Sequence, residues 1–529
     1  MSGECGEMTK SLAELIGEIG LEAPAEAASL MVASVVDDSR QVEPGSIFVA
    51  VEGLQVDGHQ FAQEAARGGA IAVVGQRGLD LNVPYFKVPD SRLALAQLAA
   101  AWYNKPAEKL VMIGITGTDG TTTTANLLHG ILTSAGLATG MITTVNAVIG
   151  DRVQETGFHV TTPPAMQVQH YLAQMVEAGM THCLIEATSH GLAQRRVAAC
   201  DFDLAVVTNI THEHIDYHGS LEAYRQAKLE LFRELDRSPL KDHRQEKIAV
   251  VNRDDSSFQA VIGTTDARKV SYGVHAGADV RAQNIQNVPT GVSFDLLAKD
   301  GKLRRLEIPL LGMYNAWNCL AAFTTAVEGL GVETDQAVHA LSHASGVPGR
   351  MEPIDLGQPF EAIIDFAHTP NALLQALKAA RERTGGRLIA IFGSAGLRDR
   401  EKRRLMAQVS AEWADITILT AEDPRTESLE DIMEEMAAAA VAGGAQRGKN
   451  LFLVPDRGQA LRQGLQMAEK GDLVIACGKG HEQSMCFGTT EYPWDDRQAM
   501  RAALSEYLGV SGPAMPALPT STAPPERTK

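Results

Sequence analysis

The chain has 529 residues, of which 45% are apolar and 21% charged, and its formal net charge at pH 7 is −18. This length exceeds what a single hydrophobic core supports, so we expect a globular protein of three domains. The acidic balance argues against a nucleic-acid or anionic-membrane surface but leaves room for local phosphate pockets. There is no signal-peptide pattern, no apolar run of membrane-spanning length and no Cys-x-x-Cys among six scattered cysteines, which predicts a cytoplasmic protein with reduced thiols.

Apolar runs alternate with amphipathic segments along most of the chain, which predicts α/β architecture. A helix is expected from Ser91 to Tyr103, followed by a linker at 104–106. The expected strands, several of them continuous apolar runs typical of buried parallel sheets, are 46–51, 70–74, 111–116, 183–186, 204–208, 362–365, 387–392 and 473–476.

These patterns divide the chain into four parts. The predicted boundaries are an N-terminal domain over 1–107, a central domain over 108–348, a C-terminal domain over 349–510 and a tail over 511–529. The tail is rich in Pro, Ala, Ser and Thr, so we expect it to be disordered.

A phosphate-binding loop begins the central part. The apolar run that starts at Val111 leads into a glycine-containing loop, Gly117, Thr118, Asp119 and Gly120, and then into hydroxyl residues that open a helix. Such a loop presents N–H groups and a helix N-terminus to phosphate. The usual loop continues Gly-Lys-Thr, with the lysine reaching the β/γ-phosphates and the hydroxyl binding Mg²⁺. Here Thr121 replaces that lysine, and Thr122 and Thr123 follow.

Polar side chains follow two of the predicted strands. Glu186 ends one strand, where ligands of open parallel sheets bind, and it is well placed to hold a metal carried by a nucleotide. A cluster that merely caps a helix, using Thr188 and Ser189, is an equally good interpretation. The loop 209–219 carries three histidines and two acids, which suits zinc or, beside a phosphate, Mg²⁺ or Mn²⁺. Two of those histidines are expected only to hydrogen-bond the loop.

Lys228 and the segment 311–322 are less informative by themselves. Lys228 resembles an ordinary lysine on the surface of a helix. The amides of Asn315 and Asn318 can offer both a donor and an acceptor to a nucleotide base, while the apolar neighbours are expected to be core.

The order of these motifs resembles the Mur ligases, the ATP-dependent amide-forming enzymes of peptidoglycan synthesis. The family's phosphate loop reads Thr-Gly-Thr-Asn-Gly-Lys-Thr, and the match covers roughly residues 30 to 508. More narrowly, the chain is similar to the branch that adds the third residue to UDP-N-acetylmuramoyl-L-alanyl-D-glutamate. Further matching motifs are Asp38-Ser39-Arg40, Thr161-Thr162-Pro163, the run 189–197, the run 311–322 and Asp365-Phe366-Ala367-His368.

The resemblance implies three α/β domains: a UDP-substrate domain, a central ATP-binding domain whose parallel sheet is flanked by helices, and a Rossmann-like C-terminal domain for the amino acid. It implies contacts to the UDP substrate from Ser39, Thr161, Thr162, Ser189, Gln194 and Arg196. It implies ATP contacts from residues 117–123, Asn315 and Asn318. Lys228 would be carbamylated, and Mg²⁺ would be held by Thr122, Glu186, His214 and that carbamate.

The resemblance also places the incoming amino acid in the last third of the chain. The implied contacts are Arg398, Glu422, Asp423, Pro424, Arg425, Gly478 and Glu482. The family motif that selects diaminopimelate is Asp-Asn-Pro-Arg, whereas this chain reads Glu-Asp-Pro-Arg. Because Asp423 adds a negative charge, we expect a preference for lysine or ornithine, although the retained Arg425 can bind a carboxylate. The choice among lysine, ornithine and diaminopimelate therefore stays open.

The function implied is ATP-dependent ligation of a diamino acid to the γ-carboxylate of D-glutamate through an acyl phosphate, by a monomer without nucleic-acid or membrane partners. Thr121 predicts impaired turnover, because charge stabilisation is almost the whole of phosphoryl-transfer catalysis. Two alternatives stay open. One is a non-catalytic nucleotide-binding relative, and the other is a ligase of the folylpolyglutamate synthase type, which lacks the Asp38-Ser39-Arg40 domain.

Overall fold

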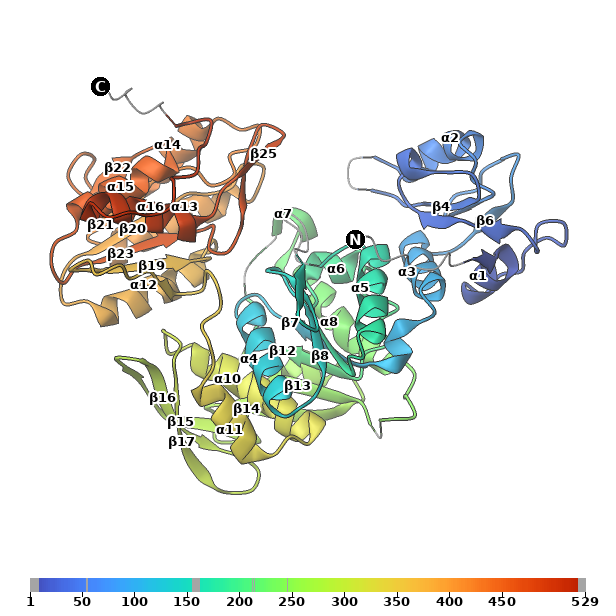
Figure 1. Ribbon diagram of the computed structural model, residues 1–529, viewed down its shortest axis with the longest axis horizontal. Coiled ribbons are helices and arrows are strands. Elements are labelled where there is room, and N and C mark those ends of the chain that lie inside the picture. Colours follow the sequence, from blue (N-terminus) through green and yellow to red (C-terminus); the bar gives the residue numbers. More distant parts are fainter. Residues whose placement is uncertain are drawn as a thin grey trace.

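The computed structural model describes residues 9–53, 56–154, 162–211, 213, 215–244 and 246–521. Three sheets lie one after another along the chain, with the first and third on opposite sides of the second (Figure 1). The α/β prediction is confirmed. None of the described helices combines the length and the apolarity needed to cross a membrane.

The first sheet has four parallel strands in the order β3-β4-β5-β6. Their bounds are β3 Ser34–Val36, β4 Ser46–Ala50, β5 Ala72–Gly75 and β6 Tyr85–Lys87, and the helices around them are α1 Leu12–Glu18, α2 Ala62–Arg67 and α3 Ser91–Trp102. A short strand pair, β1 Lys10–Ser11 and β2 Met31–Val32, precedes them. The expected linker turns sharply, since Asn104 and Lys105 both have positive φ.

The central sheet has eleven strands, and its middle is parallel from β8 to β15. In spatial order they are β10 Arg152–Gln154, β9 Ala147–Ile149, β8 Thr139–Ile142, β11 His182–Glu186, β7 Val111–Thr116, β12 Leu204–Val207, β13 Ile248–Asn252, β14 Arg268–Gly273, β15 Val280–Val288, β16 Gly291–Leu297 and β17 Leu303–Ile308. Antiparallel strands extend both edges. The sequence reading did not anticipate these extensions.

Helices cover both faces of this sheet, so β7 is buried throughout. Its alternate residues face two different cores, Ile113 and Ile115 toward α4 and α10, and Met112 toward α5 and α8. The bounds of the helices around the sheet are α4 Thr121–Ser134, α5 Ala165–Glu177, α6 Ser189–Ala193, α7 Ile215–His218, α8 Leu221–Arg237, α9 Phe258–Ile262, α10 Asn315–Thr324 and α11 Thr334–Ser342.

The third sheet is parallel except for its first, short strand. In spatial order the strands are β18 Glu352–Pro353, β19 Glu361–Asp365, β23 Leu473–Cys477, β20 Leu388–Phe392, β21 Ile416–Leu419 and β22 Leu451–Leu453. The helices are α12 Pro370–Arg383, α13 Arg400–Trp413, α14 Leu429–Ala442, α15 Arg457–Met467 and α16 Asp496–Leu508, and a hairpin pairs β24 Ser484–Phe487 with β25 Thr490–Pro493.

The expectation of disorder from residue 511 onward is wrong for the part of the tail that the structure describes, which ends at 521. Leu518 is only 5% exposed and belongs to the core on one face of the third sheet. The hydroxyls of Thr520 and Ser521 donate to the Asp456 carboxylate at 3.1 and 2.8 Å. One apolar side chain and two hydrogen bonds thus anchor a segment whose composition alone predicts no core contact.

Candidate active site

The phosphate loop joins the carboxyl end of β7 to the N-terminus of α4. Its glycines are required by close contacts, because a Cβ on Gly117 would lie 1.8 Å from the Thr208 hydroxyl and one on Gly120 would lie 2.2 Å from Asn318 Oδ1. Gly120 also has φ +83°, which favours glycine. The loop residues Thr118 and Asp119 donate their N–H groups to Asn209. The loop leads into the N-terminus of α4, whose partial positive charge favours the binding of a phosphate.

Glu186 lies beside this loop at the carboxyl end of β11. Its side chain is buried and accepts hydrogen bonds from Thr121 at 2.5 Å and from Thr122 at 3.1 Å. The backbone N–H and hydroxyl of Thr144 donate to its other oxygen, both at 3.0 Å. Thr121 thus binds the carboxylate, whereas a lysine at this position would extend toward phosphate.

Lys228 on α8 is not an ordinary surface lysine. It is 2% exposed, and its ammonium donates to the carbonyl of Gly117 at 2.5 Å. Burial lowers the pKa of Lys228 to about 8, although Glu213, Asp119 and Glu186 act in the opposite direction. The phosphate loop, Glu186 and Lys228 therefore converge, as the resemblance implied.

Two predicted residues lie outside the described residues, namely His214 and Thr161. Glu213, next to His214, is described and lines the same cavity as Lys228. Its carboxylate lies 3.5 Å from the His368 imidazole of the C-terminal part. The proposed histidine ligand thus stays a prediction.

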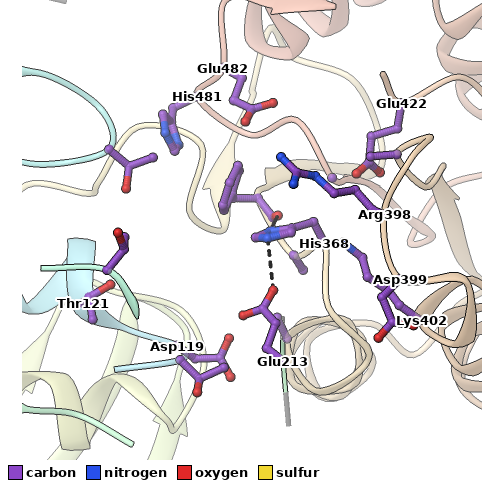
Figure 2. A pocket seen from close by; sticks show the side chains of 18 of the residues that line it. Asp119, Thr121, Glu213, His368, Arg398, Asp399, Lys402, Glu422, His481 and Glu482 are labelled. Carbon is purple, nitrogen blue, oxygen red and sulfur yellow. Dashed lines mark hydrogen bonds and ion pairs between the residues drawn. The ribbon is translucent and has the colours of Figure 1, made fainter. Parts of the chain in front are cut away.

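A cavity of about 290 Å³ lies between the phosphate loop and the loops of the third sheet (Figure 2). The predicted residues that line it come from both parts of the chain: Gly117, Thr118, Asp119, Gly120, Thr121, Glu186, Ser189, Lys228, Arg398, Glu422, Asp423, Arg425, Gly478 and Glu482. Pro424 does not line this cavity. Its carbonyl oxygen packs against Gly396, and a Cβ added to that glycine would lie 1.9 Å from the oxygen.

A second cavity of about 900 Å³ adjoins the first along the phosphate loop. Asn315, Asn318 and Thr123 line it, together with Trp317 and Tyr272. The Asn318 amide donates to Asn315 Oδ1 at 2.8 Å, and the Asn315 amide donates to the Leu311 carbonyl. These asparagines therefore also hold each other and the Leu311 backbone, besides having groups left for a base.

The residues expected at the UDP substrate fall in two places. Thr162, Gln194 and Arg196 form one hydrogen-bonded group: Arg196 donates to Gln194 Oε1 at 2.7 Å and to the Thr162 carbonyl at 2.6 Å, and Thr162 donates to the Glu186 carbonyl at 2.9 Å. Ser39 begins a short 3-10 helix beside the first sheet. Desolvation raises the pKa of Asp37, which follows β3, and the charge of Arg196 lowers it, so Arg196 lies near that sheet.

The negative charge of Asp423 is paired with a buried cation. Lys479, fully buried, lies 3.0 and 3.1 Å from the two Asp423 oxygens and 2.5 Å from Glu482, and the Cys486 N–H donates to Asp423. Because Lys479 pairs with it, Asp423 gives little reason to favour lysine or ornithine, contrary to the expectation from its charge alone. The Arg425 side chain donates to the Gly396 carbonyl. The backbone has positive φ at both Asp423 (41°) and Arg425 (53°), on either side of Pro424.

The predictions from the sequence assigned no individual role to three residues at the site. Arg350 lines both cavities and donates to the Thr122 hydroxyl at 3.2 Å, while Asn371 donates to the Asp119 carboxylate at 2.8 Å. His481 is buried at the cavity of 290 Å³. The signal for Arg350 was a lone arginine after Pro348-Gly349 at the predicted boundary, and the signal for His481 was its place between Gly480 and Glu482.

Known proteins resemble this chain along nearly all of its length. The family models that match are the Mur ligase family catalytic domain over residues 32–103, the Mur ligase middle domain over 115–326 and the Mur ligase glutamate ligase domain over 349–480. A UDP-N-acetylmuramyl-tripeptide synthetase from Roseiflexus is 43% identical over 91% of this chain and 96% of its own length.

Two further relatives carry a more specific name. A UDP-N-acetylmuramoyl-L-alanyl-D-glutamate–2,6-diaminopimelate ligase from Geobacillus thermodenitrificans is 41% identical over 89% of this chain and 94% of its own length. A solved structure of a ligase with that name has a TM-score of 0.65 and 30% identity, covering 95% of this chain and all of the other. The resemblance read from the motifs is thereby confirmed, and the chain belongs to the Mur ligase family.

Proposed function

We propose that this chain is an ATP-dependent ligase that joins diaminopimelate to the D-glutamate γ-carboxylate of UDP-N-acetylmuramoyl-L-alanyl-D-glutamate. The observation that carries the proposal is the single cavity of about 290 Å³, in which the phosphate loop and Lys228 face Glu422, Arg425 and Glu482. A phosphoryl donor and an amino acid can therefore meet there. Relatives at 41% to 43% identity bear names for this reaction or its product.

The donor set at Glu186 fits Mg²⁺. Its carboxylate and the hydroxyls of Thr121, Thr122 and Thr144 are hard oxygen ligands, and each hydroxyl lies within hydrogen-bond distance of the carboxylate. Thr122, Glu186, His214 and a carbamate on Lys228 would hold the ion. Bound there, Mg²⁺ would neutralise charge on the nucleotide phosphates.

The residues of the chain perform the remaining steps. The second cavity, lined by Asn315 and Asn318, would take the base of ATP, and the N-terminus of α4 would take its phosphates. The γ-carboxylate attacks the terminal phosphorus, ADP leaves, and an acyl phosphate forms. The amine then attacks the acyl carbon, and phosphate leaves from the tetrahedral intermediate. The loops of the third sheet exclude water from the acyl phosphate.

Diaminopimelate fits the observed charges better than lysine or ornithine. Because Lys479 pairs with Asp423 and also contacts Glu482, it offsets one of their two negative charges, and Arg425 can bind the distal carboxylate in the bidentate geometry that arginine favours. The cations Arg398 and Lys402 also line the cavity. A site with these cations suits an amino acid that carries two carboxylates.

The test measures ADP release with the UDP-dipeptide and, in turn, diaminopimelate, lysine or ornithine, for the wild-type chain and the Thr121→Lys variant. We expect release that requires both substrates and is fastest with diaminopimelate. Release that does not depend on the UDP-dipeptide would reject the ligase, and a preference for lysine would reject the assigned amino acid. No release from either chain, with ADP still bound, would favour the non-catalytic relative.

A further inference from the structure

His481 has no assigned part in the mechanism described so far. It is 5% exposed, and neither ring nitrogen has a hydrogen-bond partner among the residues that the structure describes. A buried polar group without a partner is costly, so in a core this histidine would ordinarily be satisfied. Its imidazole instead lines the cavity between the phosphate loop and the amino-acid loops, where Figure 2 shows it beside Glu482.

The backbone fixes this histidine at the cavity wall. A Cβ on Gly349 would lie 2.2 Å from the His481 nitrogen of the main chain, and Gly480 has φ 53°, so two glycines allow the close approach of these segments. The Phe366 ring lies 4.8 Å from the imidazole, centroid to centroid. The ring is thus packed on one side by an aromatic residue and forms part of the cavity wall.

We propose that His481 is a catalytic residue of the ligase, the group that accepts the proton of the incoming ammonium before the amine attacks the acyl phosphate. This inference rests on the proposed function, whose mechanism as described above gives His481 no role. Amino acids reach the site as ammonium ions, which have no lone pair for attack. A neutral imidazole within the same cavity can remove that proton.

The protons and electrons balance. One ammonium proton passes to a ring nitrogen of His481 and later to solvent. The nitrogen lone pair forms the C–N bond, and the C–O bond to phosphate breaks with its electron pair going to the phosphate oxygen. The second amine proton leaves with that phosphate, so the products are a neutral amide and hydrogen phosphate.

The charges around His481 agree with this role. Burial lowers the pKa of His481 well below the usual value, and the cations Arg350, Arg497 and Lys479 lower it further. The imidazole is therefore neutral before the substrates bind. An acyl phosphate beside Arg350 offsets part of this positive field, which makes the ring more basic once the substrates are in place.

The experiment compares two nucleophiles in the His481→Ala chain, in whichever of the wild-type and Thr121→Lys backgrounds turns over. Hydroxylamine is largely neutral at pH 7 and needs no base, whereas diaminopimelate does. We expect the variant to lose about 10²-fold in ligation of diaminopimelate. It should bind ADP normally and form the hydroxamate at the parental rate, and added imidazole should restore part of the ligation.

Three results would overturn the proposal: unchanged ligation of diaminopimelate, an equal loss with hydroxylamine, or no recovery with imidazole. His339→Ala, an exposed histidine on α11, is the control and should leave both reactions unchanged. If His481→Ala does not fold, His481→Gln keeps the polar bulk without the basic nitrogen and should show the same difference between nucleophiles. A parent chain without turnover on the UDP-dipeptide would instead count against the proposed function.

Discussion

Thr121 is the residue at which the site departs most from an ordinary phosphate loop. Its hydroxyl donates to Glu186 at 2.5 Å. Because threonine is neutral, the loop itself provides no cation where the nucleotide phosphates are expected to bind. The phosphate loop, Glu186, Lys228 and most of the predicted amino-acid contacts line one cavity, and Asn315 and Asn318 line the adjoining one. The departure is therefore a single missing charge in an otherwise assembled site.

Replacing Thr121 by lysine should raise turnover. A charge-assisted hydrogen bond contributes about 1.5–3 kcal/mol, which corresponds to roughly 10- to 150-fold in kcat/KM for ATP. The check is steady-state ADP release at saturating UDP-dipeptide and diaminopimelate. Thr133→Lys, which adds the same charge to an exposed position on α4, should have no effect. An unchanged rate in Thr121→Lys would mean that another cation already supplies the charge.

Arg350 is the cation best placed to do so. It donates to the Thr122 hydroxyl at 3.2 Å, and its guanidinium lies 4.3 Å from the centre of the Phe366 ring. We expect Arg350→Ala to raise KM for ATP and to lower kcat in the wild-type chain. In the Thr121→Lys background the same change should cost less, because the two cations serve the same phosphates. Equal losses in both backgrounds, measured as a double-mutant cycle, would show that they act independently.

Helix α8 illustrates at the scale of an element how a functional lysine can be concealed in a sequence. Its buried residues include Tyr224, Lys228, Leu231 and Leu235, which are spaced as one face of a helix. Lys228 therefore occupies an apolar position, and that spacing was the available signal. The serine N-cap of α8 at Ser220, which accepts from the Ala223 N–H, fixes where this face begins.

The buried lysine should make stability depend on pH. Its pKa is about 8 in the folded chain and about 10.4 when unfolded, so between these values the unfolded state binds more protons and stability rises with pH. At pH 7 the burial of the Lys228 ammonium lowers the free energy of unfolding by about 3 kcal/mol. In buffer free of CO₂, Lys228→Met should therefore be more stable than the wild-type chain at pH 7, and this difference in the free energy of unfolding should shrink as the pH rises to 10. Denaturant titrations of the two chains at several pH values measure the difference.

Carbamylation would reverse part of this cost. Bicarbonate should stabilise the wild-type chain, because a carbamate replaces the buried ammonium, and it should leave Lys228→Met unchanged. The reaction needs the neutral amine, so the effect of bicarbonate should grow as the pH approaches 8. A bicarbonate effect that is equal in both chains would show that Lys228 is not its target.

At the scale of the whole molecule, the sequence predicted what local patterns encode. The strands at 46–51, 204–208 and 387–392 were recognisable because they are apolar runs, and the loop at Gly117 because its glycines precede a helix. The antiparallel strands β16 and β17 were not, because polar and charged residues such as Ser293, Asp295 and Arg304 interrupt their apolar residues. The neutralisation of Asp423 by Lys479 joins residues 56 positions apart, which no local pattern shows. Arg350 and His481 did stand beside a predicted boundary and a predicted contact, but those local signals do not show which cavity each side chain lines.

Contacts across the parts of the chain hold the phosphate loop against the third sheet. Asn371 on α12 donates to Asp119 at 2.8 Å, and His368 lies 3.5 Å from Glu213. Burial raises the pKa of Asp119, and the Asn371 hydrogen bond lowers it in turn. Together with the hydrogen bond from Arg350 to Thr122, these contacts bring the amino-acid loops close to the phosphate loop.

Removing both contacts should open the molecule. In the Asn371→Ala, His368→Ala double variant we expect a larger radius of gyration in small-angle X-ray scattering without nucleotide, and a higher KM for the diamino acid. Each exposed or half-exposed polar contact contributes only about 0–1 kcal/mol, so the melting temperature should change little. Gln336→Ala removes a hydrogen bond to the Ser134 carbonyl within the central part and should leave the radius unchanged. A double variant as compact as the wild-type chain would show that other contacts between the central part and the third sheet hold the closed arrangement.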